Sequence, residues 1–178
     1  MTIAKVRALI FVAVLFVTAG IVVIMAIGRD TQTKQTHAAG CAAGEVPANN
    51  DMPERNTVTL NVYNGTSLVG LAQDVGSQFK TRGFNIGKMD TAPPKADGKP
   101  YDNIATIVFG PEAVGAAFLV SAYFLVDDAT MQFDLRRKGT QVDVVLGSKF
   151  QQLATSTEVN QSIAVIGKPP LQPGTCEA

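Results

Sequence analysis

The stretch that decides the fold is TVTLNVYNGTSLVGLAQDVGSQFKTRGFNI, residues 57–86. Apolar and polar residues alternate at its start, which is typical of a strand with one buried face. Asn64-Gly65-Thr66 then predicts a turn, and Gly83 predicts the end of a helix. Between them, apolar residues recur at the spacing of one helix face: Leu68, Leu71, Ala72, Val75 and Phe79. With a second strand predicted over 84–89, this stretch forms a β-α-β unit.

The next part of the chain predicts a second unit of the same kind. A breaker-rich loop over 90–102 leads to residues 104–109, which are apolar at nearly every position, as expected for a strand buried on both faces. Pro111-Glu112 predicts the start of a helix that continues over 113–126. That helix is almost wholly apolar, so we expect a partner surface to cover much of it.

The last part of the chain predicts two strands and one helix. Polar and apolar residues alternate over 131–136 and again over 142–146, and Lys138-Gly139-Thr140 between them predicts that the two strands form a hairpin. Thr155-Ser156-Thr157-Glu158 has the pattern of a capping box, which predicts a final short helix ended by Gly167.

The predicted order is β-α-β-β-α-β-β-α, and its first six elements match a split βαβ motif. We therefore predict an α+β fold, a two-layer sandwich with a mixed or antiparallel sheet and helices on one face, preceded by one transmembrane helix. The predicted divisions are a cytoplasmic N-terminus (1–7), a transmembrane helix (8–28), an extracytoplasmic linker (29–56) and a folded domain (57–178).

The transmembrane prediction depends on residues 8–28, which carry no charged side chain. At about 1.5 Å per residue the run spans roughly 30 Å, the thickness of the hydrocarbon core of a bilayer. A cleaved signal peptide is the alternative, but its apolar region is usually only about 7–15 residues long. Lys5 and Arg7 precede the run, so the positive-inside rule places the folded domain on the extracytoplasmic face of the cell membrane.

The two cysteines, Cys41 and Cys176, lie at the two ends of the exported part. Outside the membrane they can form a disulfide that encloses the whole domain. Two free thiols, or a lipid on Cys41, are the alternatives. A bridge would leave only residues 29–40 as a tether, which averages about 20 Å end to end and cannot exceed about 40 Å.

Composition argues against several classes of function. Fifteen Lys and Arg balance fifteen Asp and Glu, so the chain has no positive excess to attract nucleic acid. With His37 as its one histidine and two cysteines, it lacks the usual ligands of a structural zinc site. We expect no metal and no other cofactor.

The sequence offers no catalytic residues that we can assign. A nucleophile needs a base beside it, and the one histidine precedes the folded domain. Arg136, Arg137, Asp134 and Asp143 fall on predicted neighbouring strands, where ion pairing across the strands is the simpler interpretation and phosphate binding the alternative. We therefore expect a protein that is not an enzyme.

With catalysis and metal binding disfavoured, the remaining functional prediction is a surface that binds a ligand. Asn61, Tyr63, Asn64 and Thr66 offer amide and hydroxyl groups beside an aromatic ring, which suits hydrogen bonding and stacking against a sugar and equally suits an ordinary strand edge. These four residues, together with Arg136, are the candidate ligand-binding residues.

Several motifs resemble the LytR C-terminal domain family. They are Val58-Thr-Leu-Asn-Val-Tyr-Asn-Gly-Thr66, Gly70-Leu-Ala72, Arg82-Gly-Phe-Asn-Ile-Gly87, Phe109-Gly-Pro111 and Val142-Asp-Val-Val145. Three outer motifs are similar to those of actinobacterial envelope-integrity proteins of the Cei type: Ser148-Lys-Phe-Gln-Gln-Leu-Ala-Thr155, Glu158-Val-Asn160 and Pro173-Gly-Thr-Cys176.

The resemblance implies a membrane-anchored protein that supports cell-envelope integrity. In larger relatives this domain follows a catalytic domain that transfers glycopolymers onto peptidoglycan. Here the short predicted linker between the anchor and the domain has no room for one, so we do not expect transferase activity to carry over. The expected partners are the lipid bilayer and either a peptidoglycan-linked glycopolymer or wall-assembly membrane proteins. Two alternatives stay open: an enzyme of wall metabolism that uses the neighbourhood of Arg136 and Asp143, and a membrane-proximal structural or sensor protein.

Overall fold

The computed structural model describes residues 41–124 and 129–178. Within this part, five strands form one mixed sheet in the order β3-β2-β6-β4-β5. The strands are β2 (Thr59–Asn64), β3 (Asn85–Thr91), β4 (Ala105–Phe109), β5 (Ala129–Phe133) and β6 (Val142–Leu146). Neighbouring strands are parallel except β4 and β6, which are antiparallel.

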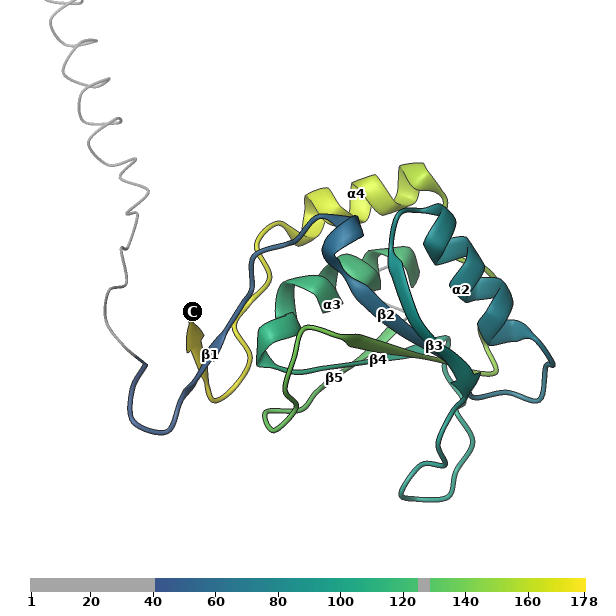
Figure 1. Cartoon of the computed structure of the whole chain (residues 1–178), viewed down its shortest axis with the longest axis horizontal. Coiled ribbons are helices and arrows are strands. Elements are labelled where there is room, and N and C mark those ends of the chain that lie inside the picture. The colour runs from purple at the N-terminus through teal and green to yellow at the C-terminus, as the bar shows by residue number, and fades with distance from the viewer. Residues whose placement is uncertain (1–40, 125–128) are drawn as a thin grey trace, which may run out of the picture. The chain divides into compact units, whose positions relative to one another are not determined.

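Three helices lie on one side of this sheet (Figure 1). They are α2 (Leu71–Thr81), α3 (Val114–Ser121) and α4 (Ser156–Ile166). Short 3-10 turns, Pro111–Ala113 and Ala122–Phe124, flank α3. The predicted α+β class, with a mixed sheet and helices on one face, is therefore confirmed.

The strand pairing differs from the sequence prediction in two ways. The split motif is wrong, because β2 and β3 are direct neighbours, as are β4 and β5; each pair is joined by its own helix as a simple βαβ unit. The hairpin of β5 with β6 is also wrong, because β4 lies between them and pairs with both. Strand β4 is buried at four of its five positions, so it occupies the interior of the sheet.

Helix α2 begins later than the apolar spacing suggested. Ala72, Val75 and Phe79 are buried, as predicted from the spacing, and Gly76 is buried beside them. Leu68, however, precedes the helix and is 60% exposed, because the turn continues to Gly70, which has a left-handed φ of 83°. At the other end Gly83, with φ of 96°, follows the last turn as predicted.

The apolar helix α3 is covered from within the domain. The chain just before the sheet crosses it closely: Gly115 N–H donates to the Asn49 carbonyl at 3.0 Å, and a Cβ on Gly115 would collide with the backbone of Asp51. The start of α4 packs against the 3-10 turn that follows α3, where Ala154 N–H donates to the Tyr123 carbonyl at 2.8 Å. No external partner is needed to bury this helix.

The capping box at the start of α4 is confirmed. The Glu158 N–H donates to the Thr155 hydroxyl oxygen, while the Thr155 N–H donates to the Glu158 carboxylate at 2.7 Å. The N–H and the hydroxyl of Thr155, which both donate to the Glu158 carboxylate, lower the pKa of Glu158 below its ordinary value.

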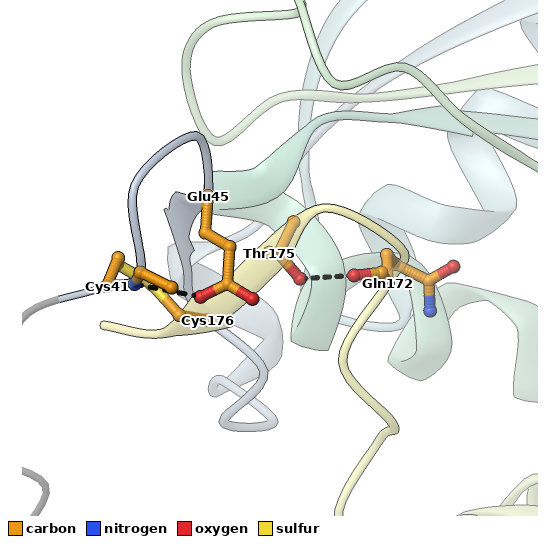
Figure 2. The surroundings of a disulfide bond; sticks show 6 residues. Cys41, Glu45, Gln172, Thr175 and Cys176 are labelled. Atoms are coloured by element: carbon orange, nitrogen blue, oxygen red, sulfur yellow. Dashed lines mark hydrogen bonds between the residues drawn. A yellow bond between two sulfur atoms is a disulfide. The ribbon is translucent and has the colours of Figure 1, made fainter.

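The two ends of the described domain are joined to each other (Figure 2). Strand β1 (Val46–Ala48), in the segment assigned to the linker, pairs in parallel with β7 (Thr175–Glu177), which the sequence analysis missed. Beside this pair a disulfide links Cys41 to Cys176, whose Cα atoms are 5.5 Å apart. The predicted disulfide is therefore present in the structure.

In residues 41–124 and 129–178, no helix has both the length and the apolar character that crossing a bilayer requires. The predicted transmembrane run, residues 8–28, lies outside the residues that the structure describes.

Candidate functional site: the open face of the sheet

One face of the sheet is not covered by any helix of residues 41–124 and 129–178, and this open face is the candidate site. Because side chains alternate along a strand, the residues between the buried core positions point away from the helices. They are Asn61 and Tyr63 on β2, Asp143 and Val145 on β6, Thr106 and Val108 on β4, and Thr130 and Gln132 on β5. The loop between β3 and β4 extends on this side of the sheet (Figure 1) and, together with the open face, bounds a groove of about 1200 Å³.

Tyr101 fixes this loop against the sheet. Its hydroxyl donates to the Pro93 carbonyl at 2.9 Å, and the Lys95 ammonium lies 4.7 Å from the centre of its ring. Its carbonyl accepts from Ser148 N–H at 2.8 Å, just beyond the end of β6. The Tyr101 ring also lies against Gly65, where a Cβ would come within 2.7 Å of the ring. These contacts hold the loop in place as one wall of the groove.

A charged network occupies the sheet face beside the groove. One oxygen of Asp143 accepts from the Asn61 amide at 2.7 Å, and the other accepts from Arg137, also at 2.7 Å. The hydrogen bond to Asp143 raises the pKa of Arg137 above its ordinary value, despite burial. Both carboxylate oxygens are therefore engaged, and Asp143 serves as a structural anchor of this face.

A bulge in β3 completes this network. The register between β2 and β3 shifts by one residue at Asn61, and the side-chain oxygen of Asn61 accepts from Lys88 N–H at 2.9 Å. A Cβ on Gly87 would lie 2.5 Å from that same oxygen, so only glycine fits there. Asn61 is 6% exposed and hydrogen-bonded on both sides, which makes it part of the scaffold rather than a free ligand contact.

Asn103 organises the hydroxyl groups at the end of the groove. Its amide nitrogen donates to the hydroxyl oxygens of Thr106 at 2.8 Å and Thr130 at 3.2 Å, while its side-chain oxygen is buried and has no hydrogen-bond partner among the described residues. The two threonines are accordingly held on adjacent strands with their hydroxyl hydrogens free to point into the groove.

The two tyrosines of the groove are neutral at physiological pH. Burial, reinforced by Asp143, raises the pKa of Tyr63, and burial together with Asp97 raises the pKa of Tyr101. Tyr63 therefore contributes a protonated hydroxyl and an aromatic ring to the lining of the groove.

The predicted ligand-binding residues do not form one cluster. Asn61 and Tyr63 lie on the open face, and Tyr63 lines the groove. Asn64 and Thr66 form the turn: the Asn64 side-chain oxygen accepts from both the N–H and the hydroxyl of Thr66, so neither side chain is free. Arg136 is exposed beyond β5, and the arginine that contacts Asp143 is Arg137.

Sequence analysis missed the groove residues on the other strands. Thr106, Thr130 and Gln132 each occupy the outward position between buried or half-buried neighbours, so the two-residue period carried the signal. The nearly unbroken apolar run of residues 104–109 hides this period, because it predicts burial on both faces.

The described residues contain no group of three or more His, Cys, Asp or Glu side chains placed to hold a metal ion.

The fold and the groove define a class: a two-layer α+β domain whose mixed sheet has helices on one face and a polar groove on the other. The chain belongs to the LytR_C family, described as LytR cell envelope-related transcriptional attenuator, whose model matches residues 57–150. Every residue of the groove lies within that range, whereas the disulfide and α4 lie outside it.

A solved structure shares this fold. It is the soluble domain of a conserved hypothetical secreted protein from Mycobacterium marinum, 22% identical, with a TM-score of 0.50. The similarity covers 75% of this chain and 91% of that one. No curated protein sequence matches the chain.

Proposed function

We propose that this protein is a membrane-anchored, extracytoplasmic binding module that supports cell-envelope integrity by holding a wall glycopolymer in the open-face groove. Three observations support the location: the envelope-related family, the uncharged run 8–28, and a disulfide, which persists in oxidising compartments. With Cys41 bridged to the domain, residues 29–40 alone would tether it near the outer surface of the membrane.

The observation that carries the proposal is the chemistry of the groove. Thr106, Thr130 and Gln132 supply hydroxyl and amide groups from the sheet, and Tyr63 supplies an aromatic ring with its hydroxyl. Sugars present hydroxyl groups around their edges and apolar C–H faces, so amides, hydroxyls and aromatic rings are their natural partners. A groove of about 1200 Å³ is large enough for several sugar units.

We propose a non-catalytic role because the carboxylate of the sheet face is already bound. Asp143 accepts hydrogen bonds at both oxygens, from Asn61 and from Arg137, which leaves it poorly suited to act as a base or nucleophile. The exposed Asp97 and Asp102 of the loop border the groove, but no histidine or cysteine lies near them to form a nucleophile and base pair in the described part of the chain.

The test is binding of soluble peptidoglycan and wall-glycopolymer fragments to the full chain in a non-ionic detergent. We expect saturable binding that weakens at least about fivefold in Tyr63→Ala and in Gln132→Ala, because each loses a stacking or hydrogen-bonding partner. Val165→Ala, at an exposed site on α4, is the matched control and should bind as the wild type does. Binding of no fragment, or equal binding by all variants, would overturn the proposal.

A further inference from the structure

A second hollow lies on the helical side of the sheet and shares no residue with the groove. It has a volume of about 330 Å³ and lies between the end of α2, the 3-10 turn after α3 and the start of α4. Its polar lining consists of Arg55, Thr81, Arg82, Tyr123, Ser156 and Asn160. We call it the arginine pocket.

Arg82 is held in place within this pocket. One of its terminal nitrogens donates to the Ala154 carbonyl at 2.7 Å, and its guanidinium carbon lies 5.4 Å from the centre of the Tyr123 ring. A guanidinium has five N–H donors in one plane, so this contact fixes its orientation and leaves donors for a ligand.

Arg55 brings a second positive charge to the same pocket. The 3-10 turn Arg55–Thr57 passes beside the end of α2, where a Cβ on Gly83 would lie 3.9 Å from the Cβ of Arg55. Among residues 41–124 and 129–178, neither Arg55 nor Arg82 has a carboxylate within 4.0 Å. Glu54 borders the adjoining hollow but pairs with neither.

Tyr123 supplies the third donor. Its side chain is 2% exposed, and its ring is packed 5.2 Å from the ring of Phe84 and 5.5 Å from that of Phe79. Burial raises the pKa of the Tyr123 hydroxyl above its ordinary value, so the hydroxyl stays protonated. The positive charges of Arg55 and Arg82 act in the opposite direction, because both lie near this hydroxyl. Within the described part of the chain this hydroxyl makes no hydrogen bond, although the side chain lines the pocket.

Two arginines that share a pocket repel each other, and an anion bound between them would relieve this repulsion. The donors here come from three separate parts of the chain: the 3-10 turn Arg55–Thr57, the residue after α2 and the 3-10 turn after α3. Arginine also matches phosphate oxygens with paired N–H groups. We propose that the arginine pocket binds a phosphate group, either free or as a phosphate ester, independently of the glycan proposed for the groove.

The test is a titration of the full chain, in non-ionic detergent, with inorganic phosphate and separately with dimethyl phosphate as a diester. Binding is followed by NMR from the arginine Nε–H signals. We expect saturable shifts of the Arg82 and Arg55 signals. Binding should weaken at least about fivefold in Arg55→Gln, which removes the charge of an exposed side chain. Arg82→Gln and Tyr123→Phe should weaken it as well. Lys138→Gln, which removes the same charge at a distant exposed turn, is the matched control and should leave binding unchanged.

Each outcome decides the proposal. Binding of either phosphate that depends on Arg55 supports it, and the two probes distinguish free phosphate from a diester. Shifts that do not saturate, or an equal affinity in Arg55→Gln and Lys138→Gln, would overturn it. Acetate is the last arm: if it binds as tightly as phosphate, the pocket is a carboxylate site and the assignment to phosphate is wrong. None of these results depends on whether glycan binds in the groove.

Discussion

Removing the disulfide is the perturbation whose magnitude the structure defines best. The bridge joins residues separated by 135 positions, so in the unfolded chain it closes a loop that contains the whole domain. The loop-entropy relation for that length gives a stabilisation of about 5 kcal/mol, near the upper end of measured values. In the folded state the bond lies beside the short β1–β7 pair, so its loss also frees these two strands to separate.

The variant is the double substitution Cys41→Ser with Cys176→Ser, and the assay is urea unfolding of the full chain in non-ionic detergent. We expect the free energy of unfolding to fall by about 3–5 kcal/mol. Wild-type protein treated with a thiol reductant is the control and should match the double variant, because both lack the same bond.

The reasoning would be refuted by a loss below about 1 kcal/mol in the double variant, provided that the wild type unfolds in a single transition. Such a result would mean that the unfolded chain gains little freedom when the bond is broken. The ends would then be held by the β1–β7 pair and its neighbours alone.

Three further predictions concern the capping box, the wall of the groove and the tyrosines. Thr155→Ala should lower the free energy of unfolding, measured in urea, by about 1 kcal/mol, because the first turn of α4 loses its cap. Thr157→Ala, within the same turn, is the control. An equal loss of stability in the two variants would contradict this prediction. Gly65→Ala should lower the free energy of unfolding by about 1–3 kcal/mol and weaken glycan binding. The reason is that the new Cβ would lie 2.7 Å from both the Leu146 carbonyl and the Tyr101 ring. Unchanged binding would argue against Tyr101 as a wall of the groove. The contribution of Tyr123 to stability should be constant below about pH 10 and should be lost as the pH rises above it. The unfolded chain releases tyrosine protons at the ordinary pKa of 10.0, whereas burial raises the pKa of Tyr123 in the folded chain. Tyr123→Phe should reduce this fall in a series of urea unfolding curves, and an identical pH dependence in that variant would contradict the assignment.

Local signals in the sequence predicted most elements of the fold. The stripe of α2, the glycine after it and the capping box of α4 each involve residues within one or two turns, where spacing and capping chemistry act directly. Strand pairing is not local. The chain does bend at Gly139-Thr140, with a left-handed Gly139, but this connection joins strands that are separated by β4. The burial of β4 decided the pairing, and no turn signal contains that information.

The site was harder to predict than the fold because it depends on which face of the sheet the helices cover. Tyr63 was predicted correctly because it is an aromatic residue among polar neighbours on a predicted strand. Tyr101, in contrast, lies in a loop whose position is determined by contacts with Gly65, Pro93 and Ser148, which no sequence pattern brings together. Asn64 and Thr66 were taken as candidate ligand contacts, although their polar groups are used within the turn itself.

The central claim, that the open-face groove is where this domain binds wall glycan, is tested most directly by NMR of the ¹⁵N-labelled full chain during titration with soluble peptidoglycan fragments. We expect amide shifts concentrated at Tyr63, Thr106 and Gln132 and along the loop around Tyr101. Shifts confined to α2 and α4, on the opposite side of the sheet, would contradict it.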